Sequence, residues 1–247
     1  MGGREGHWTD ESVIMHTALT ASGEVRSAAL PVRVFILSDH ELVRQGLGEV
    51  LEHEGFEVAG ESGSAAEATR LIPIVKPDVA ILDDRLPDGT GIEVCRYLRT
   101  TSPEVKCLLL TGWGEQQAVR ATVLAGASGY VFKQIRDNSE LIHNIRSASA
   151  GRPLLPADLR ARVTESLCAT AGAPWLSSLT ETERSVLAFM ARGLTNRQIG
   201  QELLLPQAAV AGCVPSVLQK LGFRRRGPLA PIAVPLGEGR QTVPQLY

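Results

Sequence analysis

Residues 79–87 read VAILDDRLP, four apolar residues that run directly into two aspartates, Asp83 and Asp84. The apolar run is short and continuous, which is typical of a strand covered by helices on both faces of a parallel sheet. In such sheets the polar residues that follow the strands gather at one edge, where ligands bind. The stretch therefore predicts an α/β fold with a polar site beyond the carboxyl ends of its strands.

The same pattern recurs on both sides of this stretch. Each short apolar run is followed by a segment with helical spacing, which makes five strand–helix units and predicts a doubly wound, five-stranded parallel sheet. Proline is expected to close the second helix, at Pro73. The expected strands are 32–37, 56–60, 79–82, 105–110 and 130–132, and the expected helices are 43–51, 65–72, 91–101, 115–125 and 138–150.

A second, all-α domain is expected after a break at Gly151 and Pro153. Three segments there, 181–192, 196–204 and 206–221, have helical spacing, and prolines and glycines after them argue against a further stable helix. We therefore divide the chain into a disordered extension (1–31), an α/β domain (32–152), a partly helical linker (153–175) with a hinge at 169–174, a helical domain (176–226) and a Pro/Gly-rich tail (227–247).

Charge and composition limit the function classes. Residues 32–151 hold 12 Lys and Arg against 17 Asp and Glu, whereas the chain from residue 176 onward holds 8 against 4. An acidic front half suits cation or phosphate chemistry, and a basic back half suits nucleic acid, although solvated surfaces are often biased in the same way. Four scattered cysteines have no metal-ligand spacing, and the chain shows neither a secretory signal nor a membrane-spanning run.

Polar residues stand at four of the expected strand ends: Asp39, Asp83, Thr111 and Lys133. Two carboxylates at one edge suit a hard cation such as Mg²⁺, and one of them is able to act as a nucleophile and form an aspartyl phosphate. A hydroxyl and an ammonium nearby would bind the phosphoryl oxygens. The alternative is that these residues merely mark where strands meet solvent, which explains one position more easily than four.

Four segments resemble the receiver domain of bacterial response regulators: VFILSDHELVRQGL (34–47), VAILDDRLPDGTG (79–91), 108–111 and AGASGYVFK (125–133). The resemblance covers residues 32–152 and implies a flavodoxin-like fold. It also implies that Asp83 accepts the phosphoryl group, with Asp84 as a solvated neighbour. The other implied roles are Mg²⁺ ligands at Asp39, Asp83 and the Arg85 backbone carbonyl, phosphoryl binding at Thr111 and Lys133, and an aromatic switch at Tyr130.

One residue departs from this pattern, because the family usually has two adjacent acids where this chain has Ser38-Asp39. A hydroxyl in place of a carboxylate removes negative charge from the cation site. We therefore expect phosphorylation to survive with a higher Mg²⁺ requirement.

The helical domain has the features of a helix-turn-helix. Thr180 with Glu183 forms a capping-box pattern, and a second helix follows a turn at Gly193. A three-helix bundle without DNA binding would share this pattern. Residues 179–205 and 218–223, however, resemble the LuxR-type DNA-binding domain of the NarL/FixJ response regulators. The resemblance implies phosphate contacts from Asn196 and Arg197 and further DNA contacts from Gln207, Lys220, Arg224 and Arg225, although the run 224–226 also reads as a solvated charge cluster.

The expected recognition helix departs strongly from its relatives. Positions 208 and 211, lysine in the family, are Ala208 and Ala211 here. Gly212 costs a helix roughly 1 kcal/mol relative to alanine. Pro215 costs about 3 kcal/mol in a helix interior. We therefore expect weakened DNA reading.

The resemblance implies a cytoplasmic response regulator, not an enzyme, that a sensor histidine kinase phosphorylates and that regulates transcription by binding DNA. The rival interpretation is a receiver-based interaction module whose output domain has lost sequence-specific DNA binding, for instance one that pairs with a paralogue instead of forming a homodimer. A small-molecule enzyme is disfavoured, because the chain has no Gly-rich phosphate loop and no His/Cys catalytic group.

Overall fold

The computed structural model describes residues 30–134, 138–168 and 176–225. The expected hinge at 169–174, the tail at 227–247 and all but the last two residues of the expected extension lie outside the described residues. The described residues from Val32 onward group into a single unit.

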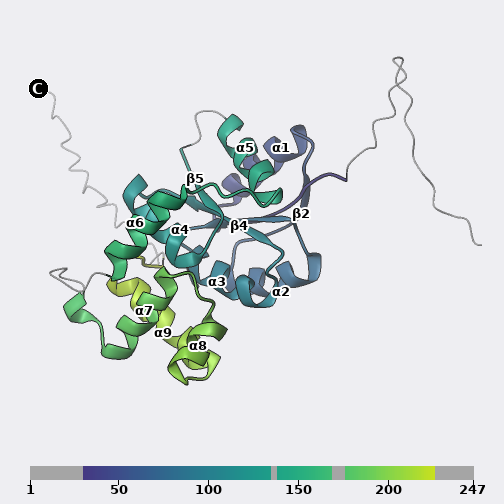
Figure 1. Cartoon of the computed structure of the whole chain (residues 1–247). Helices are drawn as coiled ribbons and strands as arrows, with labels where there is room; N and C mark the ends of the chain where they lie inside the picture. Colours follow the sequence, from purple (N-terminus) through teal and green to yellow (C-terminus); the bar gives the residue numbers. More distant parts are fainter. Residues whose placement is uncertain (1–29, 135–137, 169–175, 226–247) are drawn as a thin grey trace, which may run out of the picture. The chain divides into compact units, whose positions relative to one another are not determined.

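A five-stranded parallel sheet forms the centre of the α/β domain, with the strand order β2-β1-β3-β4-β5 (Figure 1). The order reverses on either side of β1, as expected for a doubly wound sheet, so the predicted fold is confirmed. The strands are β1 (Arg33–Leu37), β2 (Glu57–Ser62), β3 (Val79–Asp83), β4 (Lys106–Thr111) and β5 (Gly129–Phe132).

Helices cover both faces of the sheet. Alternate residues of β1 show the two faces, since Phe35 and Leu37 belong to one apolar cluster and Val34 and Ile36 to the other. Helices α2, α3 and α4, together with the C-terminal helices, supply the first cluster, and α1 and α5 supply the second. Their bounds are α1 (Glu41–His53), α2 (Ala65–Val75), α3 (Gly91–Thr101), α4 (Glu115–Ala125) and α5 (Asn138–Ser149).

Glycine allows α3 to start against the end of β3. A Cβ atom on Gly91 would lie 2.5 Å from the backbone oxygen of Asp83. Any other residue would therefore push the helix away from the strand end, so Gly91 fixes the backbone that carries the two aspartates.

The second helix differs from its prediction, because α2 continues through Pro73 and ends at Val75. Proline removes one helical hydrogen bond and crowds the preceding turn. The helix continues only to Val75, and Lys76 then adopts a left-handed conformation with φ of 47°. The proline therefore stands in the last turn, not at the helix end.

The C-terminal part is all-helical, as predicted. Thr180 with Glu183, and Thr195 with Gln198, form capping boxes that start α7 and α8. The elements are α6 (Ala157–Cys168), the short 3₁₀ turn η1 (Leu176–Ser178), α7 (Glu181–Ala191), α8 (Asn196–Leu203) and α9 (Gln207–Lys220). Helix α6 contacts both α4 and α7.

Helix α9 runs unbroken through Gly212 and Pro215. The proline removes one hydrogen bond at a cost of about 3 kcal/mol. The helix also buries apolar side chains, each contributing about 1.5–3 kcal/mol, which is enough to offset that cost. The buried side chains are Val210, Val214, Val217 and Leu218.

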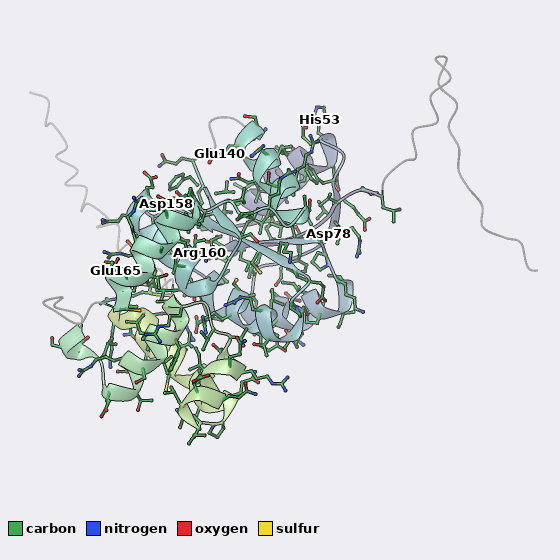
Figure 2. All side chains as sticks on the ribbon, in the orientation of Figure 1. His53, Asp78, Glu140, Asp158, Arg160 and Glu165 are labelled. Atoms are coloured by element: carbon green, nitrogen blue, oxygen red, sulfur yellow. The ribbon has the colours of Figure 1, made fainter. Side chains whose placement is uncertain are left out.

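Most charged side chains in the described part of the chain are exposed or half-buried, and several of them are labelled in Figure 2. Asp158 and Glu165 of α6 are exposed, whereas Arg160 of the same helix is partly buried and donates to the Ala127 backbone oxygen at 3.3 Å. This bond ties α6 to the loop that follows α4. Within the described ranges, no helix is both long and apolar enough to span a membrane.

Candidate functional site: a buried aspartate pair at the sheet edge

The predicted site residues meet at the carboxyl ends of β1, β3, β4 and β5. Asp83 ends β3 and is fully buried. Lys133 Nζ donates to Asp83 Oδ1 at 2.5 Å, and Ser38 Oγ donates to Asp83 Oδ2 at 2.9 Å. Both oxygens of the predicted phosphoryl acceptor are thus held by side chains from neighbouring strand ends.

Asp84 is also fully buried, so the prediction that it is a solvated neighbour is wrong. Its Oδ2 accepts hydrogen bonds from Thr111 Oγ1 at 3.0 Å and from the Gly112 backbone N–H at 3.1 Å. Its Oδ1 accepts from Lys133 Nζ at 3.2 Å. Sequence alternation could not show this, because the chain turns at the strand end and sends both adjacent carboxylates into the site.

The two aspartates differ in acidity. Burial raises the pKa of Asp83, and the neighbouring Lys133 only partly opposes this effect. Burial acts in the same direction on Asp84, but contacts with Asp83, Lys133, Gly112 and Thr111 outweigh it and lower its pKa. Asp84 is therefore the more firmly ionised member of the pair.

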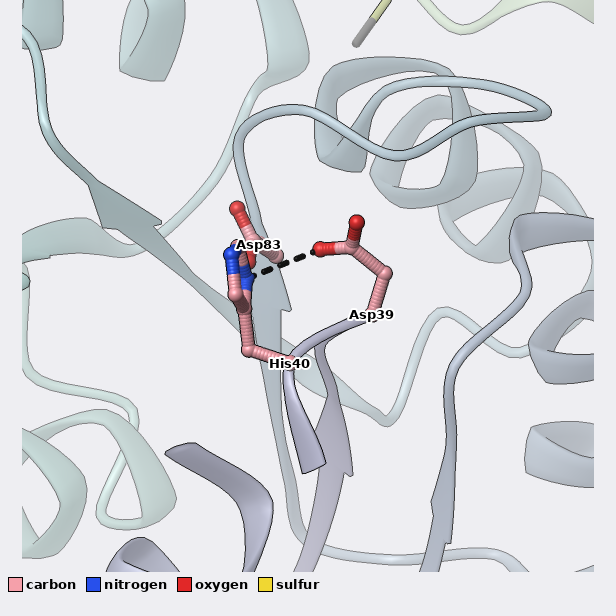
Figure 3. A group of neighbouring side chains, drawn as sticks. All are labelled: Asp39, His40 and Asp83. Carbon is pink, nitrogen blue, oxygen red and sulfur yellow. Dashed lines mark ion pairs between the residues drawn. The ribbon is translucent and has the colours of Figure 1, made fainter. Parts of the chain in front are cut away.

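Asp39 and Asp83 face each other across a small acidic cluster (Figure 3). Ligand atoms of Asp39, His40 and Asp83 all lie within 4.8 Å of one another, and His40 Nδ1 lies 3.1 Å from Asp39 Oδ1. His40 was not among the site residues predicted from the sequence. Mg²⁺ prefers oxygen ligands, so the two carboxylates fit such an ion better than the imidazole does.

The other two predicted receiver residues lie close by. The Arg85 backbone N–H donates to Asp83 Oδ1 at 3.2 Å, which places Arg85 directly beside the acceptor. Tyr130 is partly buried on β5, with its ring centre 5.3 Å from that of Phe132. Burial, together with the charges of Glu115 and Glu140, raises the pKa of Tyr130. The tyrosine is therefore a neutral, half-covered ring at neutral pH.

The predicted DNA contact Asn196 is buried against the α/β domain. Asn196 Oδ1 accepts from Arg96 Nε at 2.9 Å and from a second guanidinium nitrogen of Arg96 at 2.7 Å. Arg96 also donates to the backbone oxygens of Leu194 at 3.0 Å and Leu124 at 2.7 Å. We call this group the Arg96–Asn196 contact. Burial and the neighbouring charge on Arg99 lower the pKa of Arg96 to about 10, so it stays charged at neutral pH.

The remaining predicted DNA contacts fall into two groups. Lys220 Nζ pairs with Glu183 at 2.6 and 2.8 Å, and Arg225 pairs with Glu93 of α3 at 3.1 Å. The other predicted contacts, Arg197, Gln207 and Arg224, are exposed. Three of the six predicted side chains therefore make contacts within the chain, and one of these three, Arg225, is itself exposed.

Comparison with known proteins matches both parts of the chain. The response regulator receiver domain family matches residues 34–146, and the luxR family of bacterial regulatory proteins matches residues 177–233. The DNA-binding transcriptional activator DevR/DosR of Mycobacterium tuberculosis is 42% identical over 85% of this chain and 97% of its own length. The chain belongs to the NarL/FixJ family of two-component response regulators.

Other relatives of this response regulator agree. The transcriptional regulatory protein LiaR of Bacillus subtilis is 32% identical over 79% of this chain and 93% of its own length. The nitrate/nitrite response regulator protein NarP of Escherichia coli is 32% identical over 80% of this chain and 92% of its own length. The domain pair is thus that of a transcriptional regulator, with a receiver followed by a LuxR-type domain.

The serine that contacts Asp83 in this response regulator leads to a direct prediction. Ser38 is fully buried beside Asp83, so Ser38→Asp would add a carboxylate next to the existing acids. The added charge should lower the Mg²⁺ concentration at half-maximal phosphorylation by about tenfold, equivalent to 1.4 kcal/mol. A magnesium titration of acetyl phosphate labelling checks this, and an unchanged half-maximum would contradict it.

Glu183 ties α7 to α9 of the LuxR-type domain and makes the stability of that domain depend on pH. Hydrogen bonds from Lys220 and Ser216 lower the pKa of Glu183 to about 2, from an ordinary value of 4.5. A lowered folded-state pKa contributes stability that is present above pH 4.5 and is lost as the pH falls through 2.

Glu183→Gln should therefore lower the free energy of unfolding by about 1–2 kcal/mol at pH 7, after allowance for solvent screening of Lys220. The two proteins should become equally stable as the pH approaches 2. Urea titrations followed by helical circular dichroism at pH 7 and at low pH measure the difference. A constant difference at both pH values would show that the carboxylate charge is not the cause.

Proposed function

We propose that Asp83 is the phosphoryl acceptor of this response regulator and that a sensor histidine kinase is the donor. The observation that carries the proposal is the meeting of Asp83, Asp39 and Lys133 at one sheet edge, with Lys133 Nζ 2.5 Å from Asp83 Oδ1. In the transfer, an Asp83 carboxylate oxygen forms a bond to phosphorus as the bond between phosphorus and the donor histidine nitrogen breaks. The freed imidazole leaves with the kinase.

Each neighbour of Asp83 has a defined task in this proposal. Asp39, Asp83 and the Arg85 backbone carbonyl would hold Mg²⁺, which when bound offsets the negative charge of the phosphoryl oxygens. Lys133 supplies a second positive charge, and Thr111 supplies a hydroxyl donor. Tyr130 lies on the strand beside Thr111 and is the ring that would follow a movement of that hydroxyl.

The domain division supports a regulated DNA-binding function. We assign the receiver to 32–152, the linker to 153–175 and the LuxR-type domain to 176–226, with the extension and the tail outside them. The Arg96–Asn196 contact keeps a predicted phosphate contact away from DNA, so binding through Asn196 requires this contact to open. The protein would act in the cytoplasm, bind DNA as a homodimer or as a heterodimer with a paralogue, and carry out no catalysis on small molecules.

Because Asp83 and Asp84 are adjacent, the test of the phosphoryl acceptor has to distinguish these two positions. The full-length protein is incubated with acetyl phosphate and Mg²⁺ and then reduced with borohydride, which converts an aspartyl phosphate into homoserine. Peptide mass mapping then reads which position is converted. Conversion at position 83 supports the proposal, whereas conversion at position 84, or at neither, refutes it.

A second candidate function rests on the surface of α9. Both positions that carry lysine in relatives, Ala208 and Ala211, are exposed, and Lys220 is the only charged side chain of α9. Since Lys220 is paired with Glu183, the helix presents no unpaired cation to a phosphate backbone. This favours a receiver that acts through protein contacts, for instance by pairing with a DNA-binding paralogue.

A further inference from the structure

Asp84 is held by Thr111 and Lys133, the two donors that the proposed function assigns to a phosphoryl group, and by the Gly112 backbone N–H. We propose that the Asp84 carboxylate is a resident ligand of the phosphoryl-binding site, which a phosphoryl group on Asp83 has to displace. The inference rests on the proposed function and adds a regulatory property that the acceptor assignment does not contain.

The contacts of Asp84 are those that a phosphoryl oxygen would need. Thr111 Oγ1 and the Gly112 backbone N–H converge on Asp84 Oδ2 at 3.0 and 3.1 Å, and Lys133 Nζ lies 3.2 Å from Asp84 Oδ1. A hydroxyl, an amide and an ammonium directed at the two oxygens of one carboxylate form an anion site. A carboxylate and a phosphoryl group carry the same kind of acceptor oxygen, so they compete for these donors.

The backbone holds Asp84 in this position. The Asp84 N–H donates to the Leu110 backbone oxygen at 2.9 Å, which extends the pairing of β3 with β4 by one residue beyond Asp83. That pairing sets the side chain beside the end of β4, where Thr111 is the last strand residue and Gly112 begins the next loop. Asp84 is fully buried there, so its carboxylate takes its stabilisation from these donors and not from water.

Transfer to Asp83 therefore requires Asp84 to withdraw. Lys133 is the only cation within hydrogen-bonding distance of the two carboxylates among the described residues, and it is shared between them. A phosphoryl group would add further negative charge at the same place, and like charges repel strongly at a buried site. The Arg85 guanidinium lies 4.0 Å from Asp84 Oδ1 and is about half exposed, so it offers the displaced carboxylate a partner nearer to solvent.

The Asp84 carboxylate also takes part in a series of contacts that links the site to the LuxR-type domain before any phosphorylation. While Thr111 Oγ1 donates to Asp84, it accepts from the Trp113 backbone N–H at 3.0 Å. The Trp113 ring packs edge to face on Phe223, after α9, with ring centres 4.9 Å apart. Phosphorylation would thus replace the Asp84 carboxylate by a phosphoryl group as the acceptor of the Thr111 hydroxyl, whereas an empty site would simply be filled.

The test compares the natural full-length protein with Asp84→Ala, which removes the carboxylate, and Asp84→Asn, which keeps the shape and one acceptor oxygen. Glu104→Gln removes an exposed carboxylate elsewhere in the receiver and serves as the matched control. Acetyl phosphate with saturating Mg²⁺ is the phosphodonor, and the rate of conversion at position 83 is read by borohydride reduction. A second readout is hydrogen exchange of the Gly112 amide, measured by NMR without phosphodonor.

If Asp84 leaves the site about a tenth of the time or less, its removal should speed labelling of Asp83 by about tenfold or more, because only the open fraction reacts. Asp84→Asn should give a smaller increase, and Glu104→Gln none. Exchange of the Gly112 amide should also quicken in Asp84→Ala. Equal labelling rates at position 83, or unchanged Gly112 exchange in both Asp84 variants, would overturn the inference alone. Absence of labelling at position 83 in every protein would instead overturn the proposed function and the inference with it.

Discussion

Replacing Arg96 by methionine is expected to release the LuxR-type helices from the receiver. Arg96 is almost completely buried and makes four hydrogen bonds, three of them to Leu194 and Asn196. Hydrogen bonds from a charged donor contribute about 1.5–3 kcal/mol each, and the cost of burying the guanidinium offsets part of that gain. We expect the docked arrangement to lose about 2–4 kcal/mol, a shift of roughly 30- to 1,000-fold in the docking equilibrium.

The release is measurable at Trp113, because its ring packs on Phe223 only while the helices are docked. With Trp8 and Trp175 replaced by phenylalanine, the Trp113 emission should shift to longer wavelength in Arg96→Met, and small-angle X-ray scattering should show a larger radius of gyration. Arg96→Lys should release the helices partly, since an ammonium cannot reproduce the planar fork of donors.

Asn196→Asp provides the opposite change at the same contact. No carboxylate accepts a hydrogen bond from Arg96 among the described residues, since its acceptors are an amide oxygen and two backbone oxygens. An aspartate at position 196 would give the buried guanidinium a charged partner and should hold the helices more tightly. Identical emission and scattering in the Arg96 and Asn196 variants would show that this contact does not control docking.

The sheet and the acidic site were predictable because both depend on local sequence. Continuous apolar runs specify strands that are buried on both faces, and parallel strands bring their ends to one edge. The sequence alone was therefore enough to group four site residues, namely Asp39, Asp83, Thr111 and Lys133. The contact of Asp83 with both Lys133 and Ser38 follows the same rule, since each of these residues ends or follows its own strand.

Features that depend on distant partners were not predictable. Asp84 was expected in water, but its orientation is set by β4, which the local sequence does not reveal. Asn196 is 100 residues away from Arg96 in the sequence, and neither segment has a local pattern that predicts the hydrogen bond between them. Pro215 was expected to cost its helix about 3 kcal/mol, and local propensity does not count the apolar burial on the inner face of α9 that offsets this cost.

Substitutions in α9, the expected recognition helix, should produce the second large effect, a gain in DNA affinity. Ala208→Lys, Ala211→Lys and Pro215→Ser together should raise DNA affinity by about 10- to 100-fold at low salt and steepen its salt dependence. Both alanines are exposed, so the new ammonium groups would point to solvent without disturbing the buried side of α9. Each phosphate neutralised adds about 0.9 to the slope of log affinity against log salt. The serine restores the hydrogen bond that proline removes.

The measurement is selection of bound fragments from fragmented source-genome DNA, with and without beryllofluoride as a phosphoryl mimic, followed by salt titration on the selected sites. Ala161→Lys with Ser166→Lys adds the same charge to exposed positions of α6 and is the matched control. Enrichment of a palindromic site only by the α9 variant would mean that the natural protein has lost DNA reading and acts through protein contacts. Enrichment of that site by the natural protein would show that Asn196, Arg197 and the basic residues after α9 are sufficient, and that lysines at 208 and 211 are dispensable. An equal gain in the α6 control would attribute the effect to net charge, because lysines on α6 have no place in the helix-turn-helix contact with DNA.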